Sequence, residues 1–266
     1  MTEASAISRA AKAAKFRALH ERDGAFVIAN PWDAGSARLL CEIGFEALAT
    51  SSGASAAVRG KKDGQLTRDE ALAHAREIVA ATDLPVAADM ENGFGESPGH
   101  VAETIRLSAE AGLVGCSIED FTGDKAHPFY DLDLAVQRIA AAAEAARALP
   151  FAFTLTARCE HFLRGHADLG ATIARLQAYE AAGADVLFAP ALPDLESVRA
   201  VCAALKKPFT FMAGIPGKTF SVAALAGVGV KRISLATSLY RAAMKAVREA
   251  ATEVRATGSF GYIDRL

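Results

Sequence analysis

The strongest chemical signal in the sequence is a group of carboxylates at the ends of two short apolar runs. Asp89 and Glu91 lie in the segment 87–95, and Glu119 follows the run 115–118. Residues two apart in a strand point to the same face, so Asp89 and Glu91 share one. Neighbouring strands lie about 4.8 Å apart, so Glu119 on the next strand can join them. Three crowded carboxylates repel one another unless a cation lies among them.

The residue types favour a particular cation. Hard oxygen ligands without a His or Cys partner are typical of Mg²⁺, with Mn²⁺ as the alternative, rather than of zinc. The competing interpretation is that these acids cap helices or pair with surface lysines, but acids at strand ends are not easily neutralised by distant partners. The sequence therefore predicts a Mg²⁺ site with Asp89, Glu91 and Glu119 as metal ligands.

An arginine stands at the end of a later strand-like run, Thr154–Glu160. Arg158 at this position suits a carboxylate clamp, because a guanidinium group binds two oxygens at once. The alternative is a structural salt bridge with Glu160 or Glu119, and the two roles are compatible. We expect Arg158 to bind substrate.

Two further segments carry weaker signals. In the segment 50–55, small residues would let backbone N–H groups approach an anionic or carbonyl oxygen, although Ser/Gly turns are common. Asp63 stands in Lys62-Asp63-Gly64 and is a turn residue by default. It gains interest only if it lies beside the other acids.

Other chemistries find little support. A Schiff-base enzyme needs a desolvated lysine in the core, whereas the lysines here fall in expected loops, in helices or, for Lys231, on the outward face of a strand start. The segment 214–219 resembles a phosphate loop but lacks its spacing. His161 and His166 are five residues apart in a loop, which favours solvent or substrate-rim roles over metal binding.

Short β-rich runs alternate with Ala-rich helical stretches along the chain. Eight strands, each followed by a helix, are typical of a closed (β/α)₈ TIM barrel. The predicted strands are 26–29, 47–50, 86–89, 115–118, 152–157, 186–189, 209–213 and 233–236. The predicted helices are 34–43, 67–80, 99–111, 133–148, 169–181, 195–204, 222–226 and 239–257.

Helix ends and long loops support this pattern. Glycines precede several strands, and a glycine in the left-handed conformation commonly closes a helix; they are Gly44, Gly112, Gly183 and Gly227. Thr67 is the expected N-cap of its helix. The longest irregular stretches, 51–66 and 121–132, both follow strands, on the barrel face where active sites are built.

The bulk composition narrows the class of protein. The chain has 266 residues, 52% of them apolar, and a formal net charge of −2, so residues 1–266 are expected to form one domain that binds no nucleic acid. No apolar run is long enough to cross a membrane. Lysines interrupt the segment 1–15, which favours an N-terminal helix over a signal peptide. Four scattered cysteines predict reduced thiols and a cytoplasmic location.

Taken together, these motifs resemble the isocitrate lyase / phosphoenolpyruvate mutase superfamily. Each motif alone is common, but their order along the chain from about residue 16 to residue 248 is specific. The matching segments are Asn30-Pro31-Trp32-Asp33-Ala34, Thr50-Ser51-Ser52-Gly53, Asp63-Gly64, Asp89 to Gly95, Ile118-Glu119-Asp120 and Ala157-Arg158-Cys159-Glu160.

The resemblance implies a role for each residue of these motifs. Asp89 would bind Mg²⁺ directly, with Glu91, Glu119 and Asp63 holding its waters; Glu91 stands where many members have Asp. Ser52, Gly53 and Ala54 would bind the carboxylate and carbonyl of a pyruvyl group together with Arg158. The resemblance also implies a homotetramer in which C-terminal helices, here 239–257, are exchanged between subunits.

Two departures from the superfamily concern its branches. Isocitrate and methylisocitrate lyases carry a loop Lys-(Lys/Arg)-Cys-Gly-His after the fourth strand, whose Cys is the proposed proton donor. This chain has Lys125 at the matching lysine and no Cys in the segment 121–128. The phosphonate branch uses a His after the sixth strand, where this chain has Ala189-Pro190.

These observations predict a Mg²⁺-dependent carbon–carbon lyase or decarboxylase that acts on a small 2-oxo or 2-hydroxy acid through an enolate. Asp63, Glu119, Lys125 and Arg158 are the predicted catalytic residues. Closure of the loop 121–132 would exclude water and bring Lys125 or His127 to the leaving group. Two alternatives remain: carbon–phosphorus chemistry on phosphonopyruvate, and a 2-oxo-acid binder without catalysis.

Overall fold

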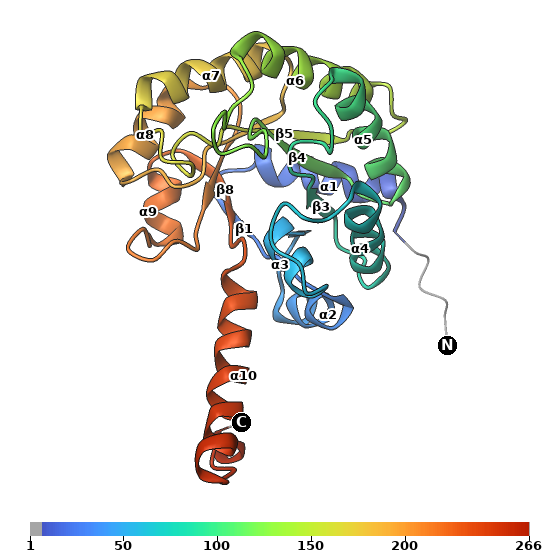
Figure 1. The fold of residues 1–266 in the computed structure, drawn as a ribbon. Helices are drawn as coiled ribbons and strands as arrows, with labels where there is room; N and C mark the ends of the chain where they lie inside the picture. Colours follow the sequence, from blue (N-terminus) through green and yellow to red (C-terminus); the bar gives the residue numbers. More distant parts are fainter. Residues whose placement is uncertain (1–6, 266) are drawn as a thin grey trace.

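The centre of the molecule is a barrel of eight parallel strands, seen in a computed structural model that describes residues 7–265 (Figure 1). The strands pair in the order β1-β8-β7-β6-β5-β4-β3-β2. Between β1 and β2, the only backbone pairing in the described residues is one isolated parallel bridge, Ala29–Leu48. The predicted (β/α)₈ barrel is confirmed. The strands are β1 (Phe26–Ile28), β2 (Leu48–Ala49), β3 (Val86–Asp89), β4 (Gly115–Glu119), β5 (Thr154–Arg158), β6 (Val186–Phe188), β7 (Phe209–Met212) and β8 (Val230–Ser234).

Apart from α10 (Ser238–Thr257), the helices surround the barrel and pack their apolar faces against it (Figure 1). These helices are α1 (Arg9–Glu21), α2 (Ala34–Ile43), α3 (Ser52–Ala57), α4 (Arg68–Ala80), α5 (Pro98–Glu110), α6 (Leu132–Arg147), α7 (Leu169–Ala181), α8 (Leu195–Ala204) and α9 (Val222–Gly227), and a short 3₁₀ turn follows α10 at Ile263–Arg265. No helix in residues 7–265 is both long and apolar enough to cross a membrane.

The predicted N-terminal helix is α1, which starts later than expected. Ser8 caps it by accepting a hydrogen bond from the Ala11 N–H, and residues 1–6 lie outside the described chain. The rings of Phe16 and Phe26 meet edge to face at 6.4 Å. Helix α1 therefore packs on the N-terminal ends of the strands, opposite the face where the predicted site residues lie.

Local capping chemistry sets several helix starts. Thr67 and Glu70 form a capping box at the start of α4, as the sequence predicts for Thr67. Asp33 and Ser36 form another at the start of α2. Gly44, Gly112 and Gly183 each adopt the expected left-handed conformation after a helix. Gly227 does not; it is the last residue of α9, and Gly229, with φ of 101°, makes the turn into β8.

The structure corrects two element predictions. The predicted strand 233–236 lies at Val230–Ser234, because parallel pairing sets Arg232 beside Phe26. Charged Lys231 and Arg232 concealed this strand from a prediction based on apolar runs. The stretch 51–66 is not wholly irregular, since Ser52–Ala57 forms α3. A helix this short carries too few apolar repeats to be detected by periodicity.

Helix α10 extends away from the barrel as a separate arm (Figure 1). None of its residues is buried. Apolar side chains are nevertheless exposed on and after it: Met244, Val247, Phe260 and Ile263 are each at least 43% exposed. At its base, the Tyr240 ring stacks edge to face on Trp32 with centroids 5.7 Å apart.

Candidate active site

The predicted site residues gather at the C-terminal ends of the strands. Asp89 from β3 and Arg158 from β5 line a cavity of about 50 Å³ inside the barrel, together with Thr50 and Ser234. A parallel barrel places the ends of all its strands on one face, which explains how residues far apart in sequence meet here.

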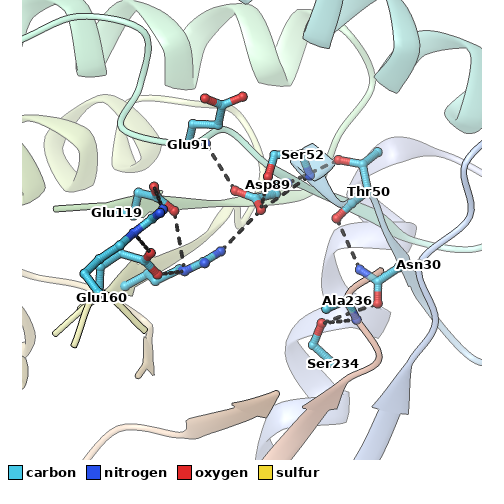
Figure 2. Close-up of polar contacts among 11 residues, drawn as sticks. Asn30, Thr50, Ser52, Asp89, Glu91, Glu119, Glu160, Ser234 and Ala236 are labelled. Carbon is cyan, nitrogen blue, oxygen red and sulfur yellow. Dashed lines mark hydrogen bonds and ion pairs between the residues drawn. The ribbon is translucent and has the colours of Figure 1, made fainter. Parts of the chain in front are cut away.

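Asp89 lies at the centre of this group (Figure 2). Its carboxylate accepts hydrogen bonds from the Ser52 hydroxyl at 3.1 Å and from the Glu91 N–H at 3.1 Å. Arg158 Nη1 lies 3.3 Å from the same carboxylate. The Asp89 side chain is therefore oriented from both sides before any ligand binds, which is the condition for a preorganised site.

A chain of polar contacts connects Asp89 to the first and last strands (Figure 2). The Ser234 hydroxyl donates to Asn30 Oδ1 at 3.3 Å, and Asn30 Nδ2 donates to the Thr50 carbonyl at 3.2 Å. The Thr50 hydroxyl accepts from the Asp89 N–H at 3.2 Å. These contacts connect the ends of β1 and β2, which pair through only one backbone bridge in the described residues. The side chains therefore add a second connection across this gap.

Arg158 is shared among three carboxylates. Its Nε lies 2.6 Å from Glu160 and 3.5 Å from Glu119, and Nη1 contacts Asp89. Burial lowers the pKa of Arg158, but these three acids raise it by more, so the guanidinium remains charged. The salt bridge anticipated as an alternative role is present. Nη2 forms no hydrogen bond within residues 7–265 and stays available to a ligand.

The surrounding acids are held in an environment that disfavours their charged forms. Burial, followed by the charges of Asp89 and Asp63, raises the pKa of Glu91 to about 8. Burial also raises the pKa of Glu119 well above its usual range, although Arg158 opposes the rise. Asp63 lies at the rim, where crowding by protein and the charge of Asp89 raise its pKa. Without a bound cation, these shifts favour the protonated forms of Glu91 and Glu119.

A hydrogen-bonded histidine holds the turn that carries the predicted substrate contacts Ser52, Gly53 and Ala54. His74 Nε2 lies 2.9 Å from the Trp32 carbonyl, so this nitrogen must donate. Nδ1 is then the acceptor, and the Ser55 hydroxyl donates to it at 2.9 Å. Burial lowers the pKa of His74, which keeps the ring in the neutral form that these bonds require. Helix α3 is thereby fixed to α4 and to the loop after β1.

Gly53 lies between Asp63 and Thr237. A Cβ atom at Gly53 would lie 3.0 Å from Thr237 Cγ2 and 3.6 Å from the Asp63 carboxyl group. A side chain here would therefore press on Thr237, the residue before α10. The structure therefore places Asp63 beside Ser52–Ala54 and near Asp89. This position meets the condition that the sequence set for a role of Asp63 beyond that of a turn residue.

Lys125 is the predicted site residue that the structure does not bring to the acids. It is exposed in the loop after β4, and within residues 7–265 its ammonium group makes no hydrogen bond or ion pair. His127 is also exposed and lies 3.3 Å from Asp124 of the same loop. Contact of either residue with a substrate would require this loop to move.

Two arginines near the site escaped the sequence analysis. Arg164 lies 2.9 Å from Glu160 and 3.8 Å from Glu119, with its guanidinium 3.6 Å from the centre of the Phe121 ring. The four-residue Glu160–Arg164 spacing is a usable signal. Arg138 is 1% exposed and donates to the carbonyls of Asn92, Gly95 and Glu96.

The position of Arg138 in the sequence also carried a signal. Ala135, Arg138, Ile139 and Ala142 follow the helical spacing of a buried face, and all four are buried in α6. A lone arginine on such a face needs partners inside the protein, because burying an unpaired charge is costly.

The oxygen-rich group around Asp89 fits a hard divalent cation, but its three predicted ligands do not form a closed set. Within residues 7–265 the only three ligand-type side chains whose atoms all lie within 4.8 Å of one another are Asp120, Cys159 and His161. Asp89, Glu91 and Glu119 are therefore more widely spread. This spacing fits direct binding by one carboxylate, with the others positioned to hold water molecules.

The Asp120 group has the contacts of a structural network. Asp120 accepts hydrogen bonds from Tyr179 at 2.8 Å and from Arg175 at 3.2 Å. Burial raises the pKa of the Cys159 thiol well above its usual range, and burial followed by the charge of Arg175 lowers the pKa of His161. A carboxylate already paired with arginine and a protonated thiol are poor ligands for a second cation.

Known proteins share this fold. Residues 16–255 match the family described as phosphoenolpyruvate phosphomutase. A crystal structure from Burkholderia cenocepacia J2315, named only provisionally as a lyase/mutase, is 55% identical, with a TM-score of 0.95 over 97% of this chain and 92% of that one.

Two curated relatives have more specific names. "Probable 2-methylisocitrate lyase 2" of Corynebacterium glutamicum is 34% identical over 87% of this chain and 77% of its own length. An oxaloacetate decarboxylase of Paraburkholderia xenovorans is 32% identical over 91% of this chain and 81% of its own length.

Proposed function

This chain belongs to the phosphoenolpyruvate phosphomutase family, and we propose that it is a carbon–carbon lyase or decarboxylase that acts on a small 2-oxo or 2-hydroxy acid through an enolate. The relatives named 2-methylisocitrate lyase and oxaloacetate decarboxylase support this class of substrate. The observation that carries the proposal is the environment of Asp89, whose carboxylate is oriented by Ser52 and Arg158 amid acids with raised pKa values.

A divalent cation, Mg²⁺ or Mn²⁺, would complete this site. Asp89 is the proposed direct ligand, and Glu91, Glu119 and Asp63 would hold the waters around the ion. The bound ion would supply positive charge that stabilises an enolate oxygen. The donor atoms are all oxygens of the kind that these ions prefer, and burial, together with the charge of Asp89, raises the pKa of Glu91 and of Glu119, so a bound cation would favour their charged forms.

The side chains around Asp89 would position the substrate. Arg158 Nη2 can donate to the substrate carboxylate, while Nε remains bound to Glu160. The backbone N–H groups of the Ser52–Ala54 turn would hold the 2-oxo group from the opposite side. With a 2-oxo acid such as oxaloacetate, the bond between carbon 3 and its carboxylate breaks, carbon dioxide leaves, and the electron pair of the bond moves onto the 2-oxo oxygen as the enolate. With a 2-hydroxy acid, the hydroxyl proton passes to a carboxylate of the site, the bond between carbons 2 and 3 breaks, the hydroxyl oxygen becomes the 2-oxo group, and the electron pair leaves as the enolate of the other fragment. These donors stabilise the charge that develops on the oxygen at carbon 2.

A proton must then reach the carbon of the enolate or the leaving group. Lys125 and His127 in the loop after β4 are the proposed donors, after closure of the loop has excluded water. Both residues are exposed in the structure, so this step depends on a loop movement.

The first experiment is calorimetric titration of oxalate, an enolpyruvate mimic, into the wild-type protein with and without Mg²⁺. We expect binding that requires the ion and is lost in Asp89→Ala. Asp23→Ala, which removes an exposed carboxylate from the opposite end of the barrel, is the control and should bind normally. Binding that is indifferent to Mg²⁺ or to Asp89 would contradict the proposed site.

A substrate panel then separates the reaction classes. Oxaloacetate, 2-methylisocitrate and related acids should yield a smaller 2-oxo acid when Mg²⁺ is present. Release of phosphate from phosphonopyruvate alone would instead indicate carbon–phosphorus chemistry. Stabilisation by pyruvate or oxalate with no turnover of any acid would indicate a binder without catalysis.

The oligomer is proposed on the basis of α10. Its exposed apolar side chains need a partner surface, since monomers rarely expose large apolar patches. A homotetramer with exchanged C-terminal helices would provide one. Light scattering should give four times the chain mass for the full chain and a smaller species for a chain truncated after Thr237. The cytoplasmic location remains a prediction.

A further inference from the structure

Arg232 on β8 is a buried cation without a carboxylate partner. It is 6% exposed, and no acid within residues 7–265 forms an ion pair with it. Nη2 donates to the Thr156 hydroxyl at 3.0 Å, while Nε has no partner. Burial lowers the pKa of Arg232 to about 9, so the group is still charged at neutral pH. A buried charge in this condition is costly unless something compensates it.

The nearby histidine does not provide that compensation. His20 Nδ1 lies 2.9 Å from the Phe16 carbonyl and must donate to it, which leaves Nε2 as an acceptor for Arg232 Nη1 at 3.4 Å. Burial lowers the pKa of His20 to about 3, so the ring is neutral. It offers one hydrogen bond and no negative charge.

Thr210 provides a second unsatisfied polar group at the same place. It is completely buried, and its hydroxyl has no hydrogen-bond partner. Thr210 on β7 is the register partner of Arg232 on β8, and both residues line the cavity that reaches Asp89. Two unpaired donors on adjacent strands therefore border one space in the barrel interior.

The size of this cavity limits its occupant. Its volume is about 50 Å³, and one water molecule needs roughly 10–15 Å³ on this measure. The space accommodates a few waters or one small ion, but not a four-carbon acid. A cation is disfavoured beside Arg232, and an anion would accept hydrogen bonds from both unpaired donors.

We propose that the barrel interior beneath the candidate active site binds one small monovalent anion of the size of chloride. Arg232 Nε and the Thr210 hydroxyl are its ligands. The ion neutralises a charge that the protein itself leaves unpaired, and it stabilises the folded barrel. The cavity extends to Asp89 and Arg158, but the two anion ligands on β7 and β8 are not among the residues proposed to bind the cation or the substrate. The anion site would therefore exist whether or not the chain is a lyase.

Crystals grown in sodium bromide provide the direct test, because bromide is located by its anomalous scattering. We expect an anomalous peak within hydrogen-bonding distance of Arg232 Nε and the Thr210 hydroxyl. The peak should be absent from Thr210→Val or clearly weaker there. A cavity that contains only water in the wild-type protein would overturn the proposal.

Thermal unfolding tests the site in solution and needs no substrate. Sodium chloride is exchanged for sodium gluconate at constant ionic strength, because gluconate is too large to enter the cavity. The wild-type protein should unfold roughly 3 °C or more higher in excess chloride. Arg232→Met should lose this response, and Thr210→Val should reduce it.

Arg76→Met, which removes an exposed arginine of α4, is the matched control and should respond to chloride as the wild type does. If Arg232→Met fails to fold, Thr210→Val and the bromide map decide the question. An equal chloride response in the wild type and Thr210→Val, without a bromide peak, would overturn the proposal.

Discussion

The loop after β3, residues 90–97, and the loop after β4, residues 121–131, border the same carboxylates but are held by different contacts. In the first loop, Arg138 of α6 binds three carbonyls, and the Thr104 hydroxyl donates to the Gly93 carbonyl at 2.8 Å. The Glu119 N–H also donates to the Glu91 carbonyl at 2.8 Å. These contacts come from other elements and are largely buried.

The second loop is held mainly by itself. The Thr122 hydroxyl donates to the His127 carbonyl at 2.6 Å, and the Ala126 N–H donates to Asp124 at 2.8 Å. Only its ends are anchored to other elements, where Phe121 lies under Arg164 and the Phe129 ring packs on His161 with centroids 4.7 Å apart. Residues 123–127 are exposed.

This difference separates two tasks. Acids that must hold a cation at fixed distances belong on backbone that does not move, and Arg138 provides this for the loop that begins beside Glu91. A residue that must approach a bound substrate and then release the product belongs on backbone with few external contacts. Changes in the first loop should therefore damage the site itself, and changes in the second should damage only its closure.

The largest effect is expected for Asp89→Asn, at the end of β3 and immediately before the firmly held loop. The change removes the charge that the proposed cation needs, so turnover of the substrate identified in the panel should fall about 1,000-fold or more. Asp124→Asn in the exposed loop is the matched control and should retain turnover within about threefold. Comparable losses in both variants would mean that the two loops do not differ in the way proposed.

Arg138→Met should release the firmly held loop. Three carbonyls lose a charged donor inside the protein, so we expect a loss of about 3 kcal/mol in the free energy of unfolding, measured with urea. Mg²⁺-dependent binding of oxalate should weaken about tenfold without being abolished, since Asp89 remains. Arg147→Met, on the exposed face of the same helix, should change neither quantity appreciably.

A lower pH should weaken the contact between His161 and Phe129, which holds one end of the second loop. Burial, with Arg175 and His166, lowers the pKa of His161 to about 4, against the attraction of Asp168. The unfolded chain therefore binds this proton more readily, and stability is lost as pH falls from about 6.5 towards 4. His161→Gln should remove on the order of 2 kcal/mol of this pH dependence. His127→Gln, an exposed change, should leave the profile unaltered.

Lys125→Ala should have the smallest effect. Its side chain is exposed and forms no hydrogen bond or ion pair in the described chain, so the free energy of unfolding should change by less than about 0.5 kcal/mol. If the loop closes with Lys125 near the leaving group, kcat should fall about tenfold, with little change in oxalate affinity. Unchanged kcat would remove Lys125 from the proposed mechanism and leave His127 as the candidate.

Strand-end residues were the most predictable part of the molecule. Strand alternation and strand adjacency predicted that Asp89, Glu91 and Glu119 meet at one end of the barrel and that Arg158 ends a strand there, and the fold brings Asp89 and Arg158 within 3.3 Å. Glu91 lies beyond the end of β3 with φ of 48°, so strand alternation does not set the direction of its side chain. The interaction of Asp63 with this group was not predictable from spacing, because it depends on the path of the loop that carries Asp63. Helix caps such as Thr67 were predictable because their partners lie three residues away.

Partnerships between distant elements were not predictable. Arg138 serves a loop more than forty positions earlier in the chain, and sequence alone does not reveal which carbonyls it reaches. Arg232 was hidden for another reason. A charged residue in a short run argues against a buried strand. The barrel nevertheless buries Arg232 in β8 and leaves its Nε without a hydrogen-bond partner.

Of the strand neighbours in the described barrel, β1 and β2 have the weakest backbone pairing, and the candidate site lies beside them. One bridge, Ala29–Leu48, and the Asn30–Thr50 contact close the gap between them, and Thr50 also orients Asp89. Warming should therefore open this gap before the other strand pairs separate. Amide hydrogens at residues 48–50 should exchange with solvent sooner than those of β4 and β5, and catalytic activity should disappear several degrees below the temperature at which the barrel melts.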